Sequence, residues 1–397
     1  MAKADGYWIF RIGSGLGLSN RSLGLIFACN LVGSFGDGLY AFLLPVYMAR
    51  TLGASSVEVG VLYAVNSLFA ASTLFVAGAL ADRYDRKKIM LAGWVAWLPA
   101  PLIFAFAQNW LQMLPGMIMW GFWLGTPTNT AYVIATADKS KLTLTFTTIS
   151  AAWSLGYILS PATGGYLAGV VGMRNVFLLA SLLYGVACLF LAFIRSQHAT
   201  RNESPSAKER YSFLKLLRTG KLLRLSLLFA AILFIIMMFR PFVPKFLTDI
   251  YHYSDSEIGI LGSITFASSA VLGILLGRLG DRTRKSYAVS VSMIFCCAAL
   301  ILLLLFGSFP VLIITFLLFG GSYLTWSLLS AIVGPLAPEA CSARWISVPQ
   351  TVSMFSSIIA PYVAGVLYAA SPFYPFMIAL VATAILALVT LTGMFKE

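Results

Sequence analysis

The sequence predicts an all-α membrane protein with twelve transmembrane helices, arranged as two six-helix bundles related by a pseudo-two-fold axis. Three observations predict this fold. Of the 397 residues, 59% are hydrophobic and only 10% are charged, whereas a soluble domain carries about 25% charged residues. The apolar runs recur at lengths of about 20 residues, the length that a bilayer-spanning helix requires. The second half of the chain also repeats the pattern of the first.

The apolar runs fall into six segments on each side of a polar gap. In chain order, we expect spans at 22–49, 57–80, 88–107, 110–136, 143–170, 174–195, 222–248, 256–279, 286–307, 309–336, 343–370 and 373–395. An even number of spans places both termini on one side of the membrane. No cleavable signal pattern opens the chain, because the first apolar run is too long for one.

The basic residues decide which side the termini occupy. With the N-terminus inside, the clusters at 83–88, 195–224 and 278–285 all lie in the cytoplasm. The basic residues left outside or within a span are Arg50, Arg174, Arg240 and Lys245. This distribution follows the positive-inside rule, so both termini are expected in the cytoplasm. The net charge of +13 therefore reflects topology, and no nucleic-acid partner is expected.

The internal repeat appears at a nearly constant offset, because Asp82 and Asp281 lie 199 residues apart (281 − 82). The pairs that match at this offset or one residue beyond it are Pro45 and Pro244, Glu58 and Glu257, Gly60 and Gly259, Pro161 and Pro361, and Gly165 and Gly365. A parallel repeat of this kind implies two halves related by an axis along the membrane normal.

The two glutamates begin spans on the outside, where a carboxylate stabilises a helix N-terminus. We expect an N-terminal bundle at 1–195, a cytoplasmic linker with an interfacial helix at 196–220, and a C-terminal bundle at 221–397.

A cytoplasmic loop reads GALADRYDRKK at 78–88 and returns as GRLGDRTRK at 277–285. With the twelve spans and the repeat, it resembles the major facilitator superfamily over essentially the whole chain. The loop pattern of that family is Gly-x-x-x-Asp-Arg/Lys-x-Gly-Arg/Lys-Arg/Lys. The matching residues are Gly78, Asp82, Arg83, Arg86 and Lys87, with Asp281 and Arg282 in a degenerate second copy. Asp85 stands where the pattern has Gly, and Asp tolerates left-handed backbone better than most residues.

The resemblance implies that Asp82 latches the first half to the start of the eleventh helix near Ser342 and holds the cytoplasmic side closed. An Asp that faces a helix N-terminus gains hydrogen bonds and a dipole interaction, and neighbouring Arg residues can hold it by charge-assisted bonds. The alternative is that Arg83, Arg86, Lys87 and Lys88 serve only the positive-inside rule.

The fifth span contains GYILSPATGG at 156–165. This segment resembles the antiporter-associated motif of the superfamily, Gly-x-x-x-Gly-Pro-x-x-Gly-Gly, and so points to the drug:proton antiporter branch. The matching residues are Gly156, Pro161, Gly164 and Gly165, while Ser160 replaces one Gly. The resemblance implies export, not uptake. The alternative is generic helix packing, because small residues let helices approach closely and Pro bends a span.

Asp37 lies near the middle of the first span. An acidic residue there costs about 2.5–3.5 kcal/mol and normally faces a cavity or a partner. Because a low-dielectric site disfavours the charged form, this carboxyl suits reversible protonation; the alternative is a carboxylate permanently satisfied by its neighbours.

The expected partner of Asp37 is Arg240 in the seventh span, which corresponds by the repeat to position 41, about 6 Å further along the helix axis. We hypothesise that the two pair while the outside is closed and that protonation of Asp37 releases Arg240. The alternative is that Arg240 snorkels to the outer interface.

A substrate cavity is expected between the first, fourth and tenth spans. Its candidate residues are aromatic or small and polar: Asn30, Tyr40, Trp123, Thr126, Asn129, Tyr323 and Trp326. Such a lining suits a lipophilic or amphipathic molecule; the alternative is helix packing and interfacial belts.

No nucleophile–base pair, metal-ligand cluster or P-loop is found in the sequence. No catalytic residue, metal or cofactor is therefore expected, and the chain is not expected to be an enzyme.

These patterns predict a secondary active transporter that works by alternating access in the plasma or cytoplasmic membrane, with proton-coupled export of a lipophilic or amphipathic small molecule. Its expected partners are that substrate, protons and membrane lipid. One chain contains both halves of a pathway, so a monomer is expected. The alternatives are an uptake carrier or facilitator for a small metabolite, and a non-transporting membrane receptor on the same fold.

Overall fold

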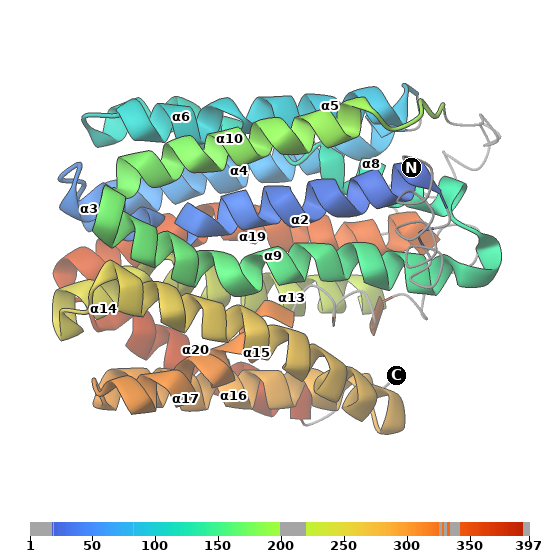
Figure 1. Cartoon of the computed structure of the whole chain (residues 1–397). Helices are drawn as coiled ribbons and strands as arrows, with labels where there is room; N and C mark the ends of the chain where they lie inside the picture. The colour runs from blue at the N-terminus through green and yellow to red at the C-terminus, as the bar shows by residue number, and fades with distance from the viewer. Residues whose placement is uncertain are drawn as a thin grey trace.

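A computed structural model of the chain describes residues 18, 20–81, 83–198, 220–324, 328, 332–333 and 342–391. Within helices, the side chains at 75, 78, 79, 81, 126, 127, 143, 221, 285 and 342–347 are outside this description. Every regular element in the described part is a helix, and the long helices run roughly side by side along one axis (Figure 1).

The first half of the chain contributes α2 (Arg21–Ala41), α3 (Leu44–Arg50), α4 (Ser56–Ala81), α5 (Arg86–Trp97), α6 (Pro99–Phe106), η1 (Trp110–Met113), α7 (Leu114–Trp120), α8 (Gly125–Thr136), η2 (Lys139–Lys141), α9 (Leu142–Val171) and α10 (Met173–Ala192). The second half contributes α13 (Gly220–Phe239), η3 (Arg240–Phe242), α14 (Val243–Tyr251), α15 (Asp255–Arg282), α16 (Lys285–Leu305), α17 (Phe309–Phe319), η4 (Gly320–Leu324), α19 (Ser342–Ala370) and α20 (Tyr374–Leu391).

Nine helical segments of the described part are long and apolar enough to cross a membrane. They are 21–50, 56–74, 86–106, 173–192, 222–251, 255–282, 286–305, 348–370 and 374–391. Three of the twelve predicted spans are not among them. The span at 110–136 is divided into η1, α7 and α8, and the span at 309–336 is described as an apolar helix only over Phe309–Leu324. The third corresponds to α9, whose Ser, Thr and Gly residues lower its hydropathy.

Several predicted spans are not single continuous helices. The first ends as α2 at Ala41 and resumes as α3 at Leu44, with Pro45 in the first turn. The seventh breaks at η3, where Pro241 and Pro244 lack the backbone N–H that a continuous helix needs. These breaks matter for function because Asp37 lies just before the first of them and Arg240 lies at the second.

The most extensive helix contacts between the two halves of the chain are those of α4 with α19 and of α9 with α15. In each pair, a glycine of one helix lies against the carbonyl oxygen of a proline of the other helix. A Cβ at Gly60 would lie 2.4 Å from the carbonyl oxygen of Pro361, and a Cβ at Gly259 would lie 2.2 Å from that of Pro161. These four residues are the ones that the repeat matches. The sequence repeat therefore appears in three dimensions as two copies of one glycine contact.

Candidate functional site

The carboxyl group of Asp37 lies inside the first half of the molecule, with only 3% of the residue exposed. It accepts hydrogen bonds from four side chains. On Oδ1 the donors are Trp120 Nε1 at 2.7 Å, Tyr40 Oη at 3.1 Å and Tyr184 Oη. On Oδ2 the donor is Tyr157 Oη. A carboxylate with four donors is fully satisfied as an anion.

Helix geometry and small residues bring these donors together. Tyr40 follows Asp37 by three residues, so both lie on one face of α2. Trp120 ends α7, Tyr157 lies in α9 and Tyr184 lies in α10. The close approach of α2 to α9 depends on glycine, because a Cβ at Gly38 would lie 1.8 Å from Ser160 Oγ.

The residues of the predicted antiporter-type motif all lie in α9 and face two neighbouring helices. Gly156 and Gly164 face α2: a Cβ there would lie 2.0 Å from Ser34 Oγ and 1.8 Å from the carbonyl oxygen of Leu39, respectively. Pro161 and Gly165 face α15. The motif therefore places α9 against both α2 and α15, which explains its small residues structurally. A role in antiport stays a prediction.

Arg240 begins η3, and its guanidinium carbon lies 3.3 Å from the centroid of the Tyr323 ring. Such cation–π stacking offsets part of the cost of a charge away from water. Arg240 also lines a cavity of ≈ 20 Å³, which has room for about one water molecule.

In the described part of the chain, the two ion pairs are Arg50–Asp255 and Lys245–Asp249, so the predicted pairing of Asp37 with Arg240 is absent from this structure. The physical reason is that four donors occupy the Asp37 carboxyl and the Tyr323 ring faces the guanidinium. A coupling or gating role for either residue stays a prediction.

A row of aromatic rings connects the two residues instead. The ring of Tyr157 lies 4.6 Å from that of Phe266 in α15, centroid to centroid. Phe266 in turn lies 5.0 Å from Tyr323, on which Arg240 rests. The row crosses from the first half of the molecule to the second.

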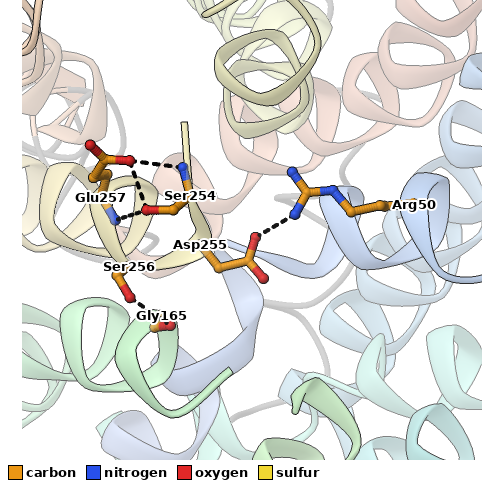
Figure 2. Close-up of polar contacts among 6 residues, drawn as sticks. All are labelled: Arg50, Gly165, Ser254, Asp255, Ser256 and Glu257. Atoms are coloured by element: carbon orange, nitrogen blue, oxygen red, sulfur yellow. Dashed lines mark hydrogen bonds and ion pairs between the residues drawn. The ribbon is translucent and has the colours of Figure 1, made fainter. Parts of the chain in front are cut away.

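The two halves also meet at one end of the bundle, here called the outer end because the basic-residue pattern predicts that it faces outside. Arg50 Nη1 lies 3.1 Å from Asp255 Oδ1, and Ser256 Oγ donates to the carbonyl oxygen of Gly165 at 3.3 Å. Both contacts are drawn in Figure 2. The N–H of Ala162 donates to Ser263 Oγ at 2.9 Å. In Figure 1, α9 and α15 lie together near α14 and separate toward the end that carries the N and C labels. The outer end is closed.

Helix N-terminal stabilisation by both predicted glutamates is confirmed. Ser254 and Glu257 form a capping box at the start of α15 (Figure 2). At the start of α4, Glu58 Oε2 accepts from the N–H of Ser55 at 2.7 Å, and the N–H of Glu58 donates to Ser55 Oγ at 3.3 Å.

The predicted cytoplasmic latch is only partly described. Asp82 lies outside the described residues, and neither the surroundings of Gly78 nor the side chain of Ser342 is described. Arg83, Asp281 and Arg282 are exposed, and Lys87 is half-buried. The latch therefore stays a prediction.

Asp85 does not use a left-handed conformation, since its φ is −58° and its ψ is 118°. It is the N-cap of α5 and accepts from the N–H of Lys87 at 2.9 Å and from the N–H of Gln197 at 3.2 Å. Arg86 Nη1 donates to Gln197 Oε1 at 3.0 Å. This loop therefore holds the chain that leaves α10 toward the linker.

These contacts also affect the protonation of Asp85. Burial alone would raise the pKa of its carboxyl, but hydrogen bonds from the N–H of Gln197, the Ser196 hydroxyl and the N–H of Lys87 lower the pKa below its ordinary value. The charged form is thus the one that the loop stabilises.

The predicted cavity residues that the structure describes differ in burial, and their role in binding stays a prediction. Tyr40 is fully buried beside Asp37 and packs against Phe104 and Phe177, so it belongs to the core of the first half. Asn30 is also buried, whereas Trp123 is 39% exposed.

Two other predicted cavity residues are also described. Asn129 keeps a buried Oδ1 that has no hydrogen-bond partner among the described residues. The Tyr323 ring meets Phe266 edge to face, and the Arg240 guanidinium lies over its face. The side chain of Thr126 and all of Trp326 lie outside the described residues.

The sequence-based reasoning missed Tyr157, Tyr184 and Phe266 as site residues. Tyr157 lies inside the antiporter-type motif, which was the available signal for it. Tyr184 and Phe266 lie in ordinary apolar runs, where one aromatic residue is not distinguishable from a packing residue.

Comparison with known proteins gives consistent matches along the chain. The sequence profile described as the Major Facilitator Superfamily matches residues 26–245 and 225–396. The multi-drug resistance efflux pump PmrA homolog of Lactococcus lactis subsp. lactis (strain IL1403) is 27% identical over 385 residues, which cover 92% of each chain. Multidrug resistance protein 2 of Bacillus subtilis (strain 168) is 24% identical over 376 residues, 90% of this chain and 92% of that protein.

Solved structures share the fold at lower identity. The crystal structure of nucleoside transporter NupG matches with a TM-score of 0.79 and 16% identity over 95% of this chain and 100% of that one. A bacterial homologue of the human lysosomal transporter Spinster, in an inward-facing and unoccupied conformation, matches with a TM-score of 0.66 and 17% identity over 95% of each chain.

Proposed function

Because the chain belongs to the major facilitator superfamily, we propose that it is a secondary active transporter of the drug:proton antiporter type, which exports a lipophilic or amphipathic small molecule in exchange for protons. The relatives named as multidrug resistance proteins support export, since two of them cover at least 90% of the chain. The aromatic side chains around Asp37 and Arg240 support a substrate with apolar surface.

The proposed architecture has twelve spans in two six-helix bundles, with the bundles at 1–195 and 221–397 joined by the linker at 196–220. The equivalent contacts of Gly60 and Gly259 support a parallel repeat. The positive-inside pattern supports cytoplasmic termini in a plasma or cytoplasmic membrane. Since one chain carries both halves, we propose that the monomer is the working unit.

The single observation that carries the proton-coupled part of the proposal is the buried Asp37 carboxyl with its four donors. A carboxyl in the middle of a span, away from water and without a basic partner in the described part of the chain, can bind a proton without breaking an ion pair. Neutralisation also removes the cost of the buried charge.

The closed outer end supports alternating access. In the described residues, the ion pair and hydrogen bonds that join α9 and α3 to α15 all lie at that end or at the depth of Asp37. We infer that the structure represents a state open to the cytoplasm, and that export requires these contacts to separate. In that second state, the Asp82 latch is proposed to close the cytoplasmic side.

The test is transport in everted membrane vesicles with an imposed proton gradient. We expect at least one of ethidium, norfloxacin and deoxycholate to dissipate the gradient in vesicles with the protein and not in vesicles without it. Accumulation driven in the opposite direction would favour an uptake carrier. Absence of flux for every compound, together with stabilisation of the protein by one of them, would favour a membrane receptor.

A further inference from the structure

The donors to Asp37 differ in what else they contact. Tyr40, Trp120 and Tyr184 donate to Oδ1, and all three belong to the first half of the chain. Tyr157 donates to Oδ2, and its ring packs on Phe266 of α15 in the second half. Tyr157 is therefore the donor that touches both the carboxyl and the opposite half.

The distribution of donors determines where a proton can be placed. An ionised carboxylate only accepts hydrogen bonds, whereas a protonated carboxyl carries an O–H donor on one oxygen. Since Oδ1 faces three donors, an added proton is placed on Oδ2. Tyr157 must then turn its hydroxyl hydrogen away from Oδ2 or leave, while the other three hydrogen bonds persist.

The ring contact lies in the same interface as the outer closure. Tyr157 precedes Ala162 in α9, and Phe266 follows Ser263 in α15, so the ring pair lies about one turn deeper than the hydrogen bond between Ala162 and Ser263. A movement of Tyr157 therefore acts on the helix pair that closes the outside.

Other groups around Asp37 do not titrate in competition with it. The titratable or charged side chains that face it are Tyr40 on its own helix, Tyr63 of α4, Tyr157 of α9 and Tyr184 of α10, with Arg240 beyond Tyr323. Tyrosine and arginine keep their protons through the physiological range. Among these groups, Asp37 is the one whose charge changes.

We propose that Tyr157 is the positioning residue that couples the protonation of Asp37 to the α9–α15 contact closing the outer end. While Asp37 is ionised, its Oδ2 holds Tyr157, and the Tyr157 ring holds Phe266. Protonation releases Tyr157, the ring contact with Phe266 loosens, and the outer end can open. This inference rests on the proposed role of Asp37 as the proton site.

The test measures the outer opening directly and needs no substrate. Nitroxide labels at Val171→Cys and Phe306→Cys, two exposed outer-end positions in different halves, are placed in the full-length protein with its native cysteines replaced. Distances between the labels are recorded by double electron–electron resonance at acidic and at neutral pH. The parent protein is expected to lengthen this distance at acidic pH.

The matched variants are Tyr157→Phe and Tyr184→Phe, which each remove one hydroxyl donor to Asp37. Either change can move the midpoint pH, so the discriminating readout is the size of the pH-dependent distance change. We expect it to be lost in Tyr157→Phe and kept in Tyr184→Phe. Phe266→Leu, which leaves the Asp37–Tyr157 hydrogen bond in place, is expected to lose it as well and covers the case in which Tyr157→Phe fails to fold.

The outcomes separate this inference from the proposed function. Loss of the pH response in Asp37→Asn, with full responses in both Tyr157→Phe and Phe266→Leu, would overturn the role of Tyr157 and leave Asp37 as the proton site. A full response in Asp37→Asn would instead reject Asp37 as the proton site. Equal losses in Tyr157→Phe and Tyr184→Phe would show that any donor serves, which also contradicts the inference.

Discussion

At the scale of single residues, buried acidic side chains are held in two different ways in this molecule. Asp37 lies mid-span and receives four side-chain donors. Asp85 lies at a helix start and receives the backbone N–H groups of Lys87 and Gln197. The first arrangement can adapt to a proton by moving a tyrosine. The second consists of fixed backbone donors, which is typical of a structural cap.

The first residue-scale prediction concerns Asp85. We expect Asp85→Ala to lower stability by about 0.5–2 kcal/mol, the usual cost of losing a helix N-cap. The measurement is thermal unfolding in detergent. Asp138→Ala is the control, because Asp138 caps only the three-residue η2 and no residue of η2 is buried. An equal loss in both variants would contradict a special role for the Asp85 loop.

The pH dependence of the same variant follows from the lowered pKa of Asp85. A carboxyl with a lowered pKa in the folded state stabilises the fold above the unfolded pKa, about 4, and this stabilisation is lost as the pH falls through the lowered pKa. The gap in unfolding temperature between the parent protein and Asp85→Ala should therefore be full at neutral pH and close below about pH 4. A gap that widens on acidification would contradict this assignment.

At the scale of elements, the close contacts of α4 with α19 and of α9 with α15 hold the halves together. Glycine is required because the opposing atoms are backbone carbonyls, which cannot move aside as a flexible side chain can. The exposed ion pair beside them contributes less. Arg50 and Asp255 have side chains that are 50% and 28% exposed, and such pairs contribute about 0–1 kcal/mol.

The first element-scale prediction compares two glycines of α15. A Cβ at Gly259 would lie 2.2 Å from the carbonyl oxygen of Pro161, whereas a Cβ at Gly277 meets nothing within 4 Å. We expect Gly259→Ala to lengthen the outer-end label distance and Gly277→Ala to leave it unchanged, with a small gain of helix stability of about 0.5–1 kcal/mol. Distances unchanged in both variants would contradict the contact.

The second element-scale prediction concerns the ion pair. The Arg50–Asp255 pair is exposed, so it should stabilise the closed outer end by about 1 kcal/mol at most. Asp255→Asn should therefore change the ratio of outer-open to outer-closed molecules by about fivefold or less. Its effect should shrink at high salt. An opening as large as that of Gly259→Ala would mean that the ion pair, not the glycine contact, holds the outer end.

Some features of the elements and their contacts can be predicted from the sequence, and others cannot. The apolar runs and basic clusters predict helices and topology because lipid and water impose them locally. The repeat predicts that Gly60 and Gly259 are equivalent, because both halves fold alike. Tyr40 lies three residues from Asp37 on the same helix, but the other three donors could not be paired with Asp37 from the sequence, since Trp120, Tyr157 and Tyr184 lie 83, 120 and 147 residues away in the chain. No local pattern links residues at such separations.

At the scale of the whole molecule, contacts between the halves at one end of the bundle define the conformation. The outer end is closed by backbone contacts, hydrogen bonds and an ion pair. The described parts of α9 and α15 separate toward the other end (Figure 1). The proposed export requires alternation between this state and its opposite, and a proton shifts that equilibrium only if the two states bind it with different affinity.

Proton-coupled transport through Asp37 is measured most directly as substrate-driven proton movement in proteoliposomes of purified protein. The parent protein and Asp37→Asn are compared with the compound that the parent moves in vesicles. We expect the parent to exchange protons for the compound, and Asp37→Asn to move the compound only down its own gradient, with no proton movement. Full proton exchange by folded Asp37→Asn would show that Asp37 is not the proton site.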